Sequence, residues 1–281
     1  MTAINDRISI RIDGDIGYLI SHNPPVNALG IAVRQGLVAG LAALNADPAV
    51  RAIVLFCEGR TFFAGADITE FGKPRLSPTL QEVIAPLEAS AAPVIAAIHG
   101  TALGGGFEVA LGCPFRVGVA TARVGLPEIA LGLFAGGGGT QRLPRLIGPE
   151  AALELVLSGK PVRAAEAQAL GILDALGESD PAAVGTAFAR RVIDERLPAV
   201  PLRLREEKIA ATRADPAAFE ALAQRLTARS KGQLAPAANV ASIRRAFTLP
   251  LDEALEIDAA ANRELMAGSQ SRALRHLFFA E

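Results

Sequence analysis

Two glutamates, Glu108 and Glu128, lie in segments whose composition suits carbonyl chemistry. Glu108 follows the triple glycine 104–106, which opens an apolar stretch with helical spacing. The backbone N–H groups at such a helix start favour an anion or a developing oxyanion. Glu128 follows a second turn-forming segment, Gly125-Leu126-Pro127. Two carboxylates beside such a site would hold one water between them, which predicts addition of water to an activated carbonyl compound, or proton transfer on it.

Composition restricts the class of protein. With 28 basic and 29 acidic residues the net charge is −1, so neither nucleic acid nor an anionic membrane is expected as a bulk partner. The N-terminus carries Asp6 and lacks an apolar signal-peptide region, and the uncharged run 89–107 contains Pro93 and several glycines, which favours a strand, a turn and a helix start over a membrane span. Cys57 and Cys113 lie in apolar segments, which predicts buried thiols in a cytoplasmic protein.

Periodicity predicts the elements that position the two glutamates. Apolar alternation over 8–12 and 16–20 predicts an opening hairpin, and apolar residues at helical spacing over 30–45 predict a helix. Continuous apolar runs over 51–56 and 93–98 predict buried strands. Strands of this kind that alternate with helices indicate an α/β fold whose sheet is covered on both faces.

The second half of the chain has a different character from Pro149 onward. We predict a crossover core over residues 1–200 and a C-terminal helical region over 201–281. Helices are predicted over 150–158, 164–170, 181–197, 216–230 and 252–279, with Pro198, Pro201, Pro236 and Pro250 between the segments.

Four segments occur in the order of a known family. They are Phe63 to Ile68 (FAGADI), His99 to Glu108 (HGTALGGGFE), Leu126-Pro127-Glu128, and Gly139 to Leu143 (GTQRL), and they resemble the signature segments of the crotonase superfamily, specifically of enoyl-CoA hydratases. The resemblance spans roughly residues 8–230, and four motifs in register make it more specific than any single glycine motif. It implies a crotonase (ClpP-like) ββα-spiral core that binds a CoA thioester, with a helical C-terminal part.

The resemblance also implies roles for individual residues. The backbone N–H groups of Ala66 and Gly105 would form an oxyanion hole, because glycine at 105 lets a thioester approach the backbone. Glu108 would activate water and Glu128 would deliver a proton to the α-carbon, giving syn hydration of a trans-2-enoyl-CoA in fatty-acid β-oxidation. The implied substrate and CoA contacts are Ala28, Ala64, Asp67, Ile68, Thr69 and Gly104. Thr69 stands where many relatives carry lysine, so the partner of the CoA phosphates is left open between Lys73 and an arginine elsewhere.

Other interpretations stay open beside this one. A Δ3,Δ2-enoyl-CoA isomerase needs one carboxylate and the same oxyanion hole, and a non-catalytic acyl-CoA-binding protein needs neither carboxylate; the presence of both Glu108 and Glu128 favours hydration. Each glutamate also suits a structural role as an acid at a helix start, and Asp67 suits a helix cap. His99, at the end of an apolar strand, is expected to be a hydrogen-bonded core histidine.

Expectations about partners follow from the C-terminal segment. From Pro236 onward it resembles the linker that joins the hydratase half of peroxisomal-type bifunctional enzymes to a 3-hydroxyacyl-CoA dehydrogenase half. The sequence contains no G-x-G-x-x-G fingerprint, so a dehydrogenase domain is expected only in a longer protein. No metal and no cofactor are expected apart from the CoA of the substrate. A monomer is expected if the C-terminal helices cover the core through Leu274, Leu277, Phe278 and Phe279, and a homotrimer otherwise.

Overall fold

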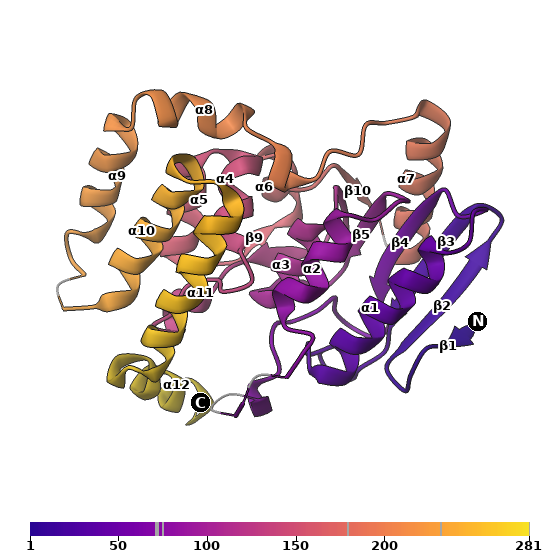
Figure 1. The fold of residues 1–281 in the computed structure, drawn as a ribbon, viewed down its shortest axis with the longest axis horizontal. Coiled ribbons are helices and arrows are strands. Elements are labelled where there is room, and N and C mark those ends of the chain that lie inside the picture. The colour runs from indigo at the N-terminus through magenta and orange to yellow at the C-terminus, as the bar shows by residue number, and fades with distance from the viewer. Residues whose placement is uncertain (71–72, 75, 179, 231, 281) are drawn as a thin grey trace. The chain divides into compact units, whose positions relative to one another are not determined.

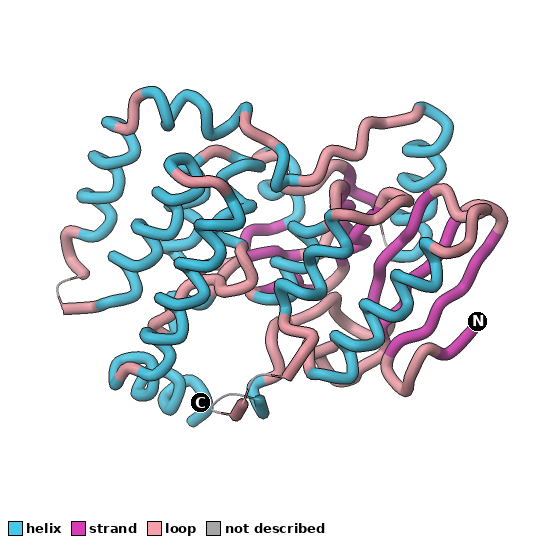
Figure 2. Tube along the Cα trace, in the orientation of Figure 1, coloured by secondary structure: helices cyan, strands magenta, loops and turns pink. Residues whose placement is uncertain are grey.

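The structure is a computed structural model that describes residues 1–70, 73–74, 76–178, 180–230 and 232–280. The chain divides into two compact units, each built from two stretches of sequence. The first unit comprises residues 1–124 and 162–202, and the second comprises residues 125–161 and 203–281. Figure 1 labels the helices and strands, and Figure 2 distinguishes them by colour. The division into a core over 1–200 and a helical region over 201–281 stays a prediction.

A seven-stranded sheet forms the centre of the first unit, in the order β1-β2-β3-β4-β5-β7-β10. The first three strands pair antiparallel, and the pairs from β3 to β10 are parallel. The hairpin expected over 8–12 and 16–20 and the strands expected over 51–56 and 93–98 are confirmed. The strand bounds are Thr2–Ala3 (β1), Ile8–Asp13 (β2), Ile16–Ser21 (β3), Ala52–Cys57 (β4), Val94–Ile98 (β5), Phe115–Val119 (β7) and Ala175–Gly177 (β10).

Helices cover both faces of this sheet, as the apolar strands predict (Figure 1). On one face Val54 packs in a buried cluster with Phe188 and Val192 of helix α7. On the other face helix α1 comes so close that a Cβ at Gly40 would lie 2.6 Å from Leu19 Cδ1. The helices of this unit are α1 (Ile31–Asn45), η1 (Ile68–Glu70), α2 (Leu80–Glu88), α3 (Gly105–Gly112), α6 (Ala164–Ala169) and α7 (Pro181–Glu195). A three-stranded sheet has the order β6-β8-β9, with bounds Thr101–Leu103, Arg123–Gly125 and Val162–Arg163.

The second unit is helical in its described part (Figure 2). A buried polar network joins three of its helices: Asp258 on α11 accepts hydrogen bonds from Gln141 on α4 at 2.7 Å and from Ser242 on α10 at 2.5 Å. Arg245 donates to the other carboxylate oxygen at 2.8 Å, so the buried Asp258 is both ion-paired and hydrogen-bonded. The helices are η2 (Glu128–Leu131), α4 (Gly139–Ile147), α5 (Pro149–Ser158), α8 (Glu207–Ala214), α9 (Ala217–Thr227), α10 (Leu234–Thr248), α11 (Leu251–Ala267) and α12 (Ser269–Ala280), and η3 (Leu202–Leu204) leads into them.

The C-terminal helices differ from expectation in three ways. The single helix expected over 252–279 is wrong, because Gly268 adopts an extended conformation and separates α11 from α12. Pro236 does not lie between helices but in the first turn of α10, where its missing N–H needs no acceptor within the helix. Of the residues through which cover was expected, Leu274, Leu277 and Phe278 are 37%, 60% and 55% exposed, and the side chain of Phe279 lies outside the described part of the structure. Among the described residues, no helix has the length and apolar character needed to cross a membrane.

Candidate active site

At the start of α3, the backbone of the triple glycine lies close to the backbone of Phe63. Gly104 has φ 51° and ψ −126°, which glycine adopts at low cost, and α3 begins at the next residue. A Cβ at Gly106 would lie 1.9 Å from the carbonyl oxygen of Phe63, so no side chain fits there. The N–H of Leu103 donates to the same Phe63 oxygen at 3.3 Å. The triple glycine therefore brings the helix start against the segment that leads to Ala66.

Ala66 and Gly105 lie close together at this point. A Cβ at Gly105 would lie 3.6 Å from the backbone nitrogen of Ala66 and 3.0 Å from Leu80 Cδ2. Ala66 forms an isolated parallel bridge with Leu29, whose N–H donates to the Gly65 carbonyl at 2.9 Å. The first N–H groups of a helix lack carbonyl partners within it, so the helix start is suited to a negatively charged oxygen. The two residues that sequence comparison pairs as oxyanion donors are thus neighbours in space.

Glu108 lies in the first turn of α3 and is 2% exposed. Its N–H donates to the Gly104 carbonyl at 2.9 Å, so the turn that carries the carboxylate is the turn set by the triple glycine. A buried carboxylate is uncommon in proteins because its desolvation is costly. Its burial in the first turn of α3 distinguishes Glu108 from a solvated surface acid.

Glu128 belongs to the second unit, where it begins the short helix η2 after Pro127. Its carbonyl accepts a hydrogen bond from Leu133 at 3.1 Å, which closes the turn. The buried side chain of Asn239 on α10 donates to the Leu133 carbonyl at 3.1 Å and so holds this turn from outside. On α12, Ser271 and Leu274 lie against Gly132, where a Cβ would approach Leu274 Cδ1 to 3.0 Å. The turn carrying Glu128 is therefore braced by two C-terminal helices.

Apart from Gly104 at the start of α3, the residues expected to contact CoA lie on two adjoining segments of the first unit. Ala64 donates its N–H to the Val26 carbonyl at 3.2 Å, which joins the segment 63–69 to the loop that contains Ala28. Asn27 organises that loop from a left-handed conformation (φ 52°), with its amide donating to Glu58 and Thr61 carbonyls at 2.9 and 2.8 Å. Asp67, Ile68 and Thr69 follow directly along the chain, and Asp67 Oδ1 accepts from Thr69 N at 2.9 Å, which confirms Asp67 as a helix cap.

Three further residues contact the segments that carry Ala66 or Glu128, and they were not identified from the sequence. Arg34 and Glu70 form an ion pair at 2.8 Å beside the Ala66 segment, and Asn239 holds the Glu128 turn. Arg34 could have been noticed because it is a charged residue next to Val33 and near Leu37, which belong to the apolar face of α1. Asn239 had no comparable signal, because its partner Leu133 is distant in the sequence.

Other reactive groups are buried in structural positions. Cys57 and Cys113 are buried as expected, and burial raises the pKa of both thiols, that of Cys113 to about 12. A thiol with a raised pKa is a poor nucleophile near neutral pH. His99 is also buried as expected, with Nε2 bonded to the Gly59 carbonyl at 3.1 Å.

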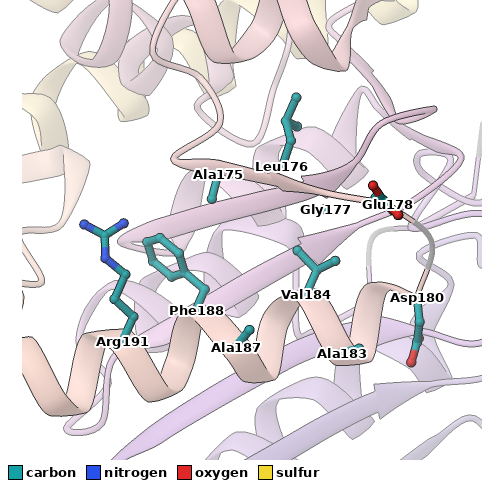
Figure 3. Close-up of a pocket in the computed structure, with 10 residues that line it drawn as sticks. All are labelled: Ala175, Leu176, Gly177, Glu178, Asp180, Ala183, Val184, Ala187, Phe188 and Arg191. Atoms are coloured by element: carbon teal, nitrogen blue, oxygen red, sulfur yellow. The ribbon is translucent and has the colours of Figure 1, made fainter.

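A surface pocket of about 410 Å³ lies elsewhere in the first unit, between β10 and α7. Figure 3 shows Val184 and Phe188 directed from α7 toward the strand, with Arg191 at one end. Arg191 is paired with Glu195 at 3.0 Å. None of the residues with expected catalytic or CoA-binding roles lines this pocket.

Residues 11–231 match the sequence model of the enoyl-CoA hydratase/isomerase family. The chain belongs to this family. The peroxisomal bifunctional enzyme of Danio rerio is 41% identical over 262 residues, which cover 92% of this chain and 36% of that protein. The shared region is the N-terminal part of such bifunctional enzymes, as the resemblance implied. The probable enoyl-CoA hydratase of Bacillus subtilis (strain 168) is 42% identical over 184 residues, covering 63% of this chain and 71% of that protein.

Solved structures agree with this family assignment. A putative enoyl-CoA hydratase from Streptomyces avermitilis, 25% identical, superposes with a TM-score of 0.71 over 100% of this chain and 92% of that chain. The predicted fold class is confirmed: this is the α/β crotonase fold with C-terminal helices.

Proposed function

We propose that this family member catalyses syn addition of water to a trans-2-enoyl-CoA, forming a 3-hydroxyacyl-CoA. The observation that carries the proposal is the start of α3, where the Gly105 and Ala66 backbones approach each other and the same helix turn carries the buried Glu108. Membership of the enoyl-CoA hydratase/isomerase family supports an acyl-CoA substrate. The B. subtilis relative, which carries hydratase in its name, supports hydration.

In the proposed reaction, the oxygen of water bonds to the β-carbon of the enoyl thioester. The electron pair of the carbon–carbon double bond moves toward the thioester carbonyl, whose oxygen becomes an enolate oxyanion. The Ala66 and Gly105 N–H groups donate to that oxygen, and each such donor is worth about 3 kcal/mol in other enzymes. Glu108 accepts the proton released by water, and Glu128 gives a proton to the α-carbon. Return of the proton from Glu108 to Glu128 through solvent restores both groups.

We further propose that the CoA part of the substrate lies along the two adjoining segments of the first unit. The backbones of Ala64 and Ile68 would contact the adenine, and the pantetheine would run past Ala66, Asp67, Ile68 and Thr69. Ala28, in the adjoining loop, and Gly104, at the start of α3, would add further substrate contacts. Hydrogen bonding between the two segments supports this, since it fixes them as one surface. The buried thiols Cys57 and Cys113 support a reducing, cytoplasmic location.

The test is hydration of crotonyl-CoA, followed as loss of the absorbance of its conjugated thioester. A series of trans-2-enoyl-CoAs of increasing length would define the chain-length preference. We expect saturable hydration and formation of 3-hydroxybutyryl-CoA. A purified chain that binds crotonyl-CoA without turnover would overturn the proposal in favour of a binding protein.

Isomerisation is the second candidate, because the matching family includes isomerases as well as hydratases. Moving a double bond from the 3- to the 2-position needs an oxyanion hole and one carboxylate to transfer a proton between carbons. Assay with trans-3-hexenoyl-CoA distinguishes the two activities. Appearance of conjugated absorbance with that substrate, without hydration of crotonyl-CoA, would favour the isomerase.

A further inference from the structure

Arg34 is a buried guanidinium whose hydrogen bonds reach segments far apart in the sequence. Its side chain is 9% exposed and lies on α1. Nη1 donates to the Leu29 carbonyl at 2.7 Å and to the Glu70 carboxylate at 2.8 Å. Nε donates to the Pro78 carbonyl at 2.6 Å. Because arginine presents its donors in a rigid fork, one side chain fixes the spacing between all three partners.

Glu70 ties the end of the Ala66 segment to the start of α1. One carboxylate oxygen accepts from Arg34, and the other accepts from the Ile31 N–H at 2.7 Å. Ile31 is the first residue of α1, where a negative charge is favoured by the helix dipole. Gly30 accommodates this arrangement, since a Cβ there would lie 2.8 Å from Asp67 Oδ2.

These bonds hold Ala66 from both sides. Before Ala66, the Gly65 carbonyl accepts from the Leu29 N–H at 2.9 Å, while the Leu29 carbonyl is held by Arg34. After Ala66, Glu70 is held by the same guanidinium. Ala66 therefore lies between two points that Arg34 fixes.

Arg34 also bears on Gly105 through α2. Pro78, whose carbonyl accepts from Arg34, precedes the first residue of α2, Leu80, by two positions. Leu80 Cδ2 lies 3.0 Å from the position of a Cβ on Gly105. One guanidinium thus joins the surroundings of both proposed oxyanion donors.

We propose that Arg34 and Glu70 form a clamp that sets the relative positions of the Ala66 and Gly105 backbone N–H groups. They are positioning residues: they act on the substrate carbonyl only through those donors. The inference rests on the proposed function, because it assigns these donors to the thioester oxygen. If these N–H groups are displaced by even a fraction of a hydrogen-bond length, they stabilise the developing negative charge less well.

The test measures polarisation of a bound thioester as well as turnover. The thioester 4-(dimethylamino)cinnamoyl-CoA absorbs at longer wavelength when its carbonyl accepts hydrogen bonds, because electron density moves from the amino group to oxygen. The variants are Arg34→Met, which removes every donor, and Glu70→Gln, which removes the charge but keeps an acceptor for Ile31. Arg191→Met is the matched control, since Arg191 pairs with Glu195 on the exposed face of α7.

We expect Arg34→Met to lower kcat for crotonyl-CoA by about 10-fold to 100-fold, less than the loss of a whole donor, and to reduce the red shift of the bound chromophore. Glu70→Gln should show a smaller change in the same direction. KM and the pH profile of kcat/KM should change little, because Glu108 and Glu128, which are proposed to transfer the protons, are intact in both variants. Arg191→Met should match the parent in kcat and red shift.

A folded Arg34→Met protein with parental kcat and full red shift would overturn the clamp. If Arg34→Met does not fold, an unchanged red shift and kcat in Glu70→Gln would overturn it equally. The red shift is measured without turnover, so a failure of the proposed hydration can be told apart from a failure of the clamp. A parental chain that shifts the chromophore without hydrating crotonyl-CoA contradicts only the proposed function. A parental chain that hydrates crotonyl-CoA, with an Arg34→Met variant of equal kcat and equal red shift, contradicts only the clamp.

Discussion

A carboxylate that exchanges protons with a substrate loses that capacity when it becomes an amide. We therefore expect Glu108→Gln and Glu128→Gln each to lower kcat for crotonyl-CoA hydration by about 10²-fold or more. Binding of the unreactive butyryl-CoA, measured by calorimetric titration, should be retained. Glu195→Gln, on the exposed part of α7, is the control. Hydration near the parental rate by either variant would remove that glutamate from the proton path.

The backbone donor at Gly105 is testable because of its place in α3. Gly105 is the first residue of the helix, a position where proline is tolerated, so Gly105→Pro deletes the N–H without breaking a bond within the helix. We expect kcat to fall by about 10²-fold to 10³-fold. Gly105→Ala is the matched control, because it also places a Cβ against Leu80 but keeps the N–H. Equal kcat values for the two variants would mean that bulk, and not the donor, matters.

At the scale of elements, one side-chain amide on α10 contributes to holding the Glu128 turn. Asn239 Nδ2 donates to the buried Leu133 carbonyl, whereas Oδ1 has no hydrogen-bond partner among the described residues. Asn239→Asp keeps the shape but replaces the donating amide with a carboxylate oxygen, which would face the Leu133 carbonyl oxygen. We therefore expect it to lower the unfolding free energy by about 1–3 kcal/mol. Asn239→Leu should be the milder change, since it leaves the carbonyl unbonded but adds no charge. Urea unfolding measures both, and equal stability of parent and Asn239→Asp would contradict the role.

Helices and strands with strong hydrophobic periodicity could be predicted from the sequence. Those that depend on contacts with other parts of the folded chain could not. The alternation over 8–12 and the apolar run over 51–56 directly give β2 and β4, because each pattern matches one burial geometry. Helix α10 was missed because Pro236 suggests a break, although a first-turn proline fits a helix. Helix α8, Glu207–Ala214, buries only two residues and offers little periodic signal.

The candidate site shows the same division. The roles proposed for Glu108 and Ala66 follow from motifs in register, which the sequence displays directly. Arg34 was out of reach, because its partners Glu70, Leu76 and Pro78 are brought to it only by the folded chain. No local pattern encodes hydrogen bonds to main-chain carbonyls at such separations.

At the scale of the whole molecule, His99 couples stability to pH. Burial lowers the pKa of His99, partly opposed by its bond to the Gly59 carbonyl and by Asp180. Its Nδ1 has no hydrogen-bond partner among the described residues, so a proton there would be buried without an acceptor. Below the unfolded pKa of about 6.5, the unfolded chain takes up a proton that folded His99 does not, and stability falls.

We therefore expect His99→Gln to flatten the dependence of unfolding free energy on pH between about 7 and 5. Thermal or urea unfolding at several pH values measures this slope. The window lies above the range in which Asp15, Glu82 and Glu220, whose pKa values are lowered, lose their stabilising charge. The exposed His22→Gln is the control for a change of histidine. A slope in His99→Gln as steep as in the parent would contradict this assignment.

The interleaving of the two units has a consequence for how the chain emerges from the ribosome. Helix α7 covers one face of the sheet, yet it is synthesised only after the whole segment 125–161 of the other unit. Until residue 195 has left the exit tunnel, the face formed by Tyr18, Val54 and Ala97 has no helix to bury it. Until then, the apolar residues of these strands lack the helix that buries them in the folded unit. Exposed apolar surface of this kind is vulnerable to aggregation and suited to chaperone capture.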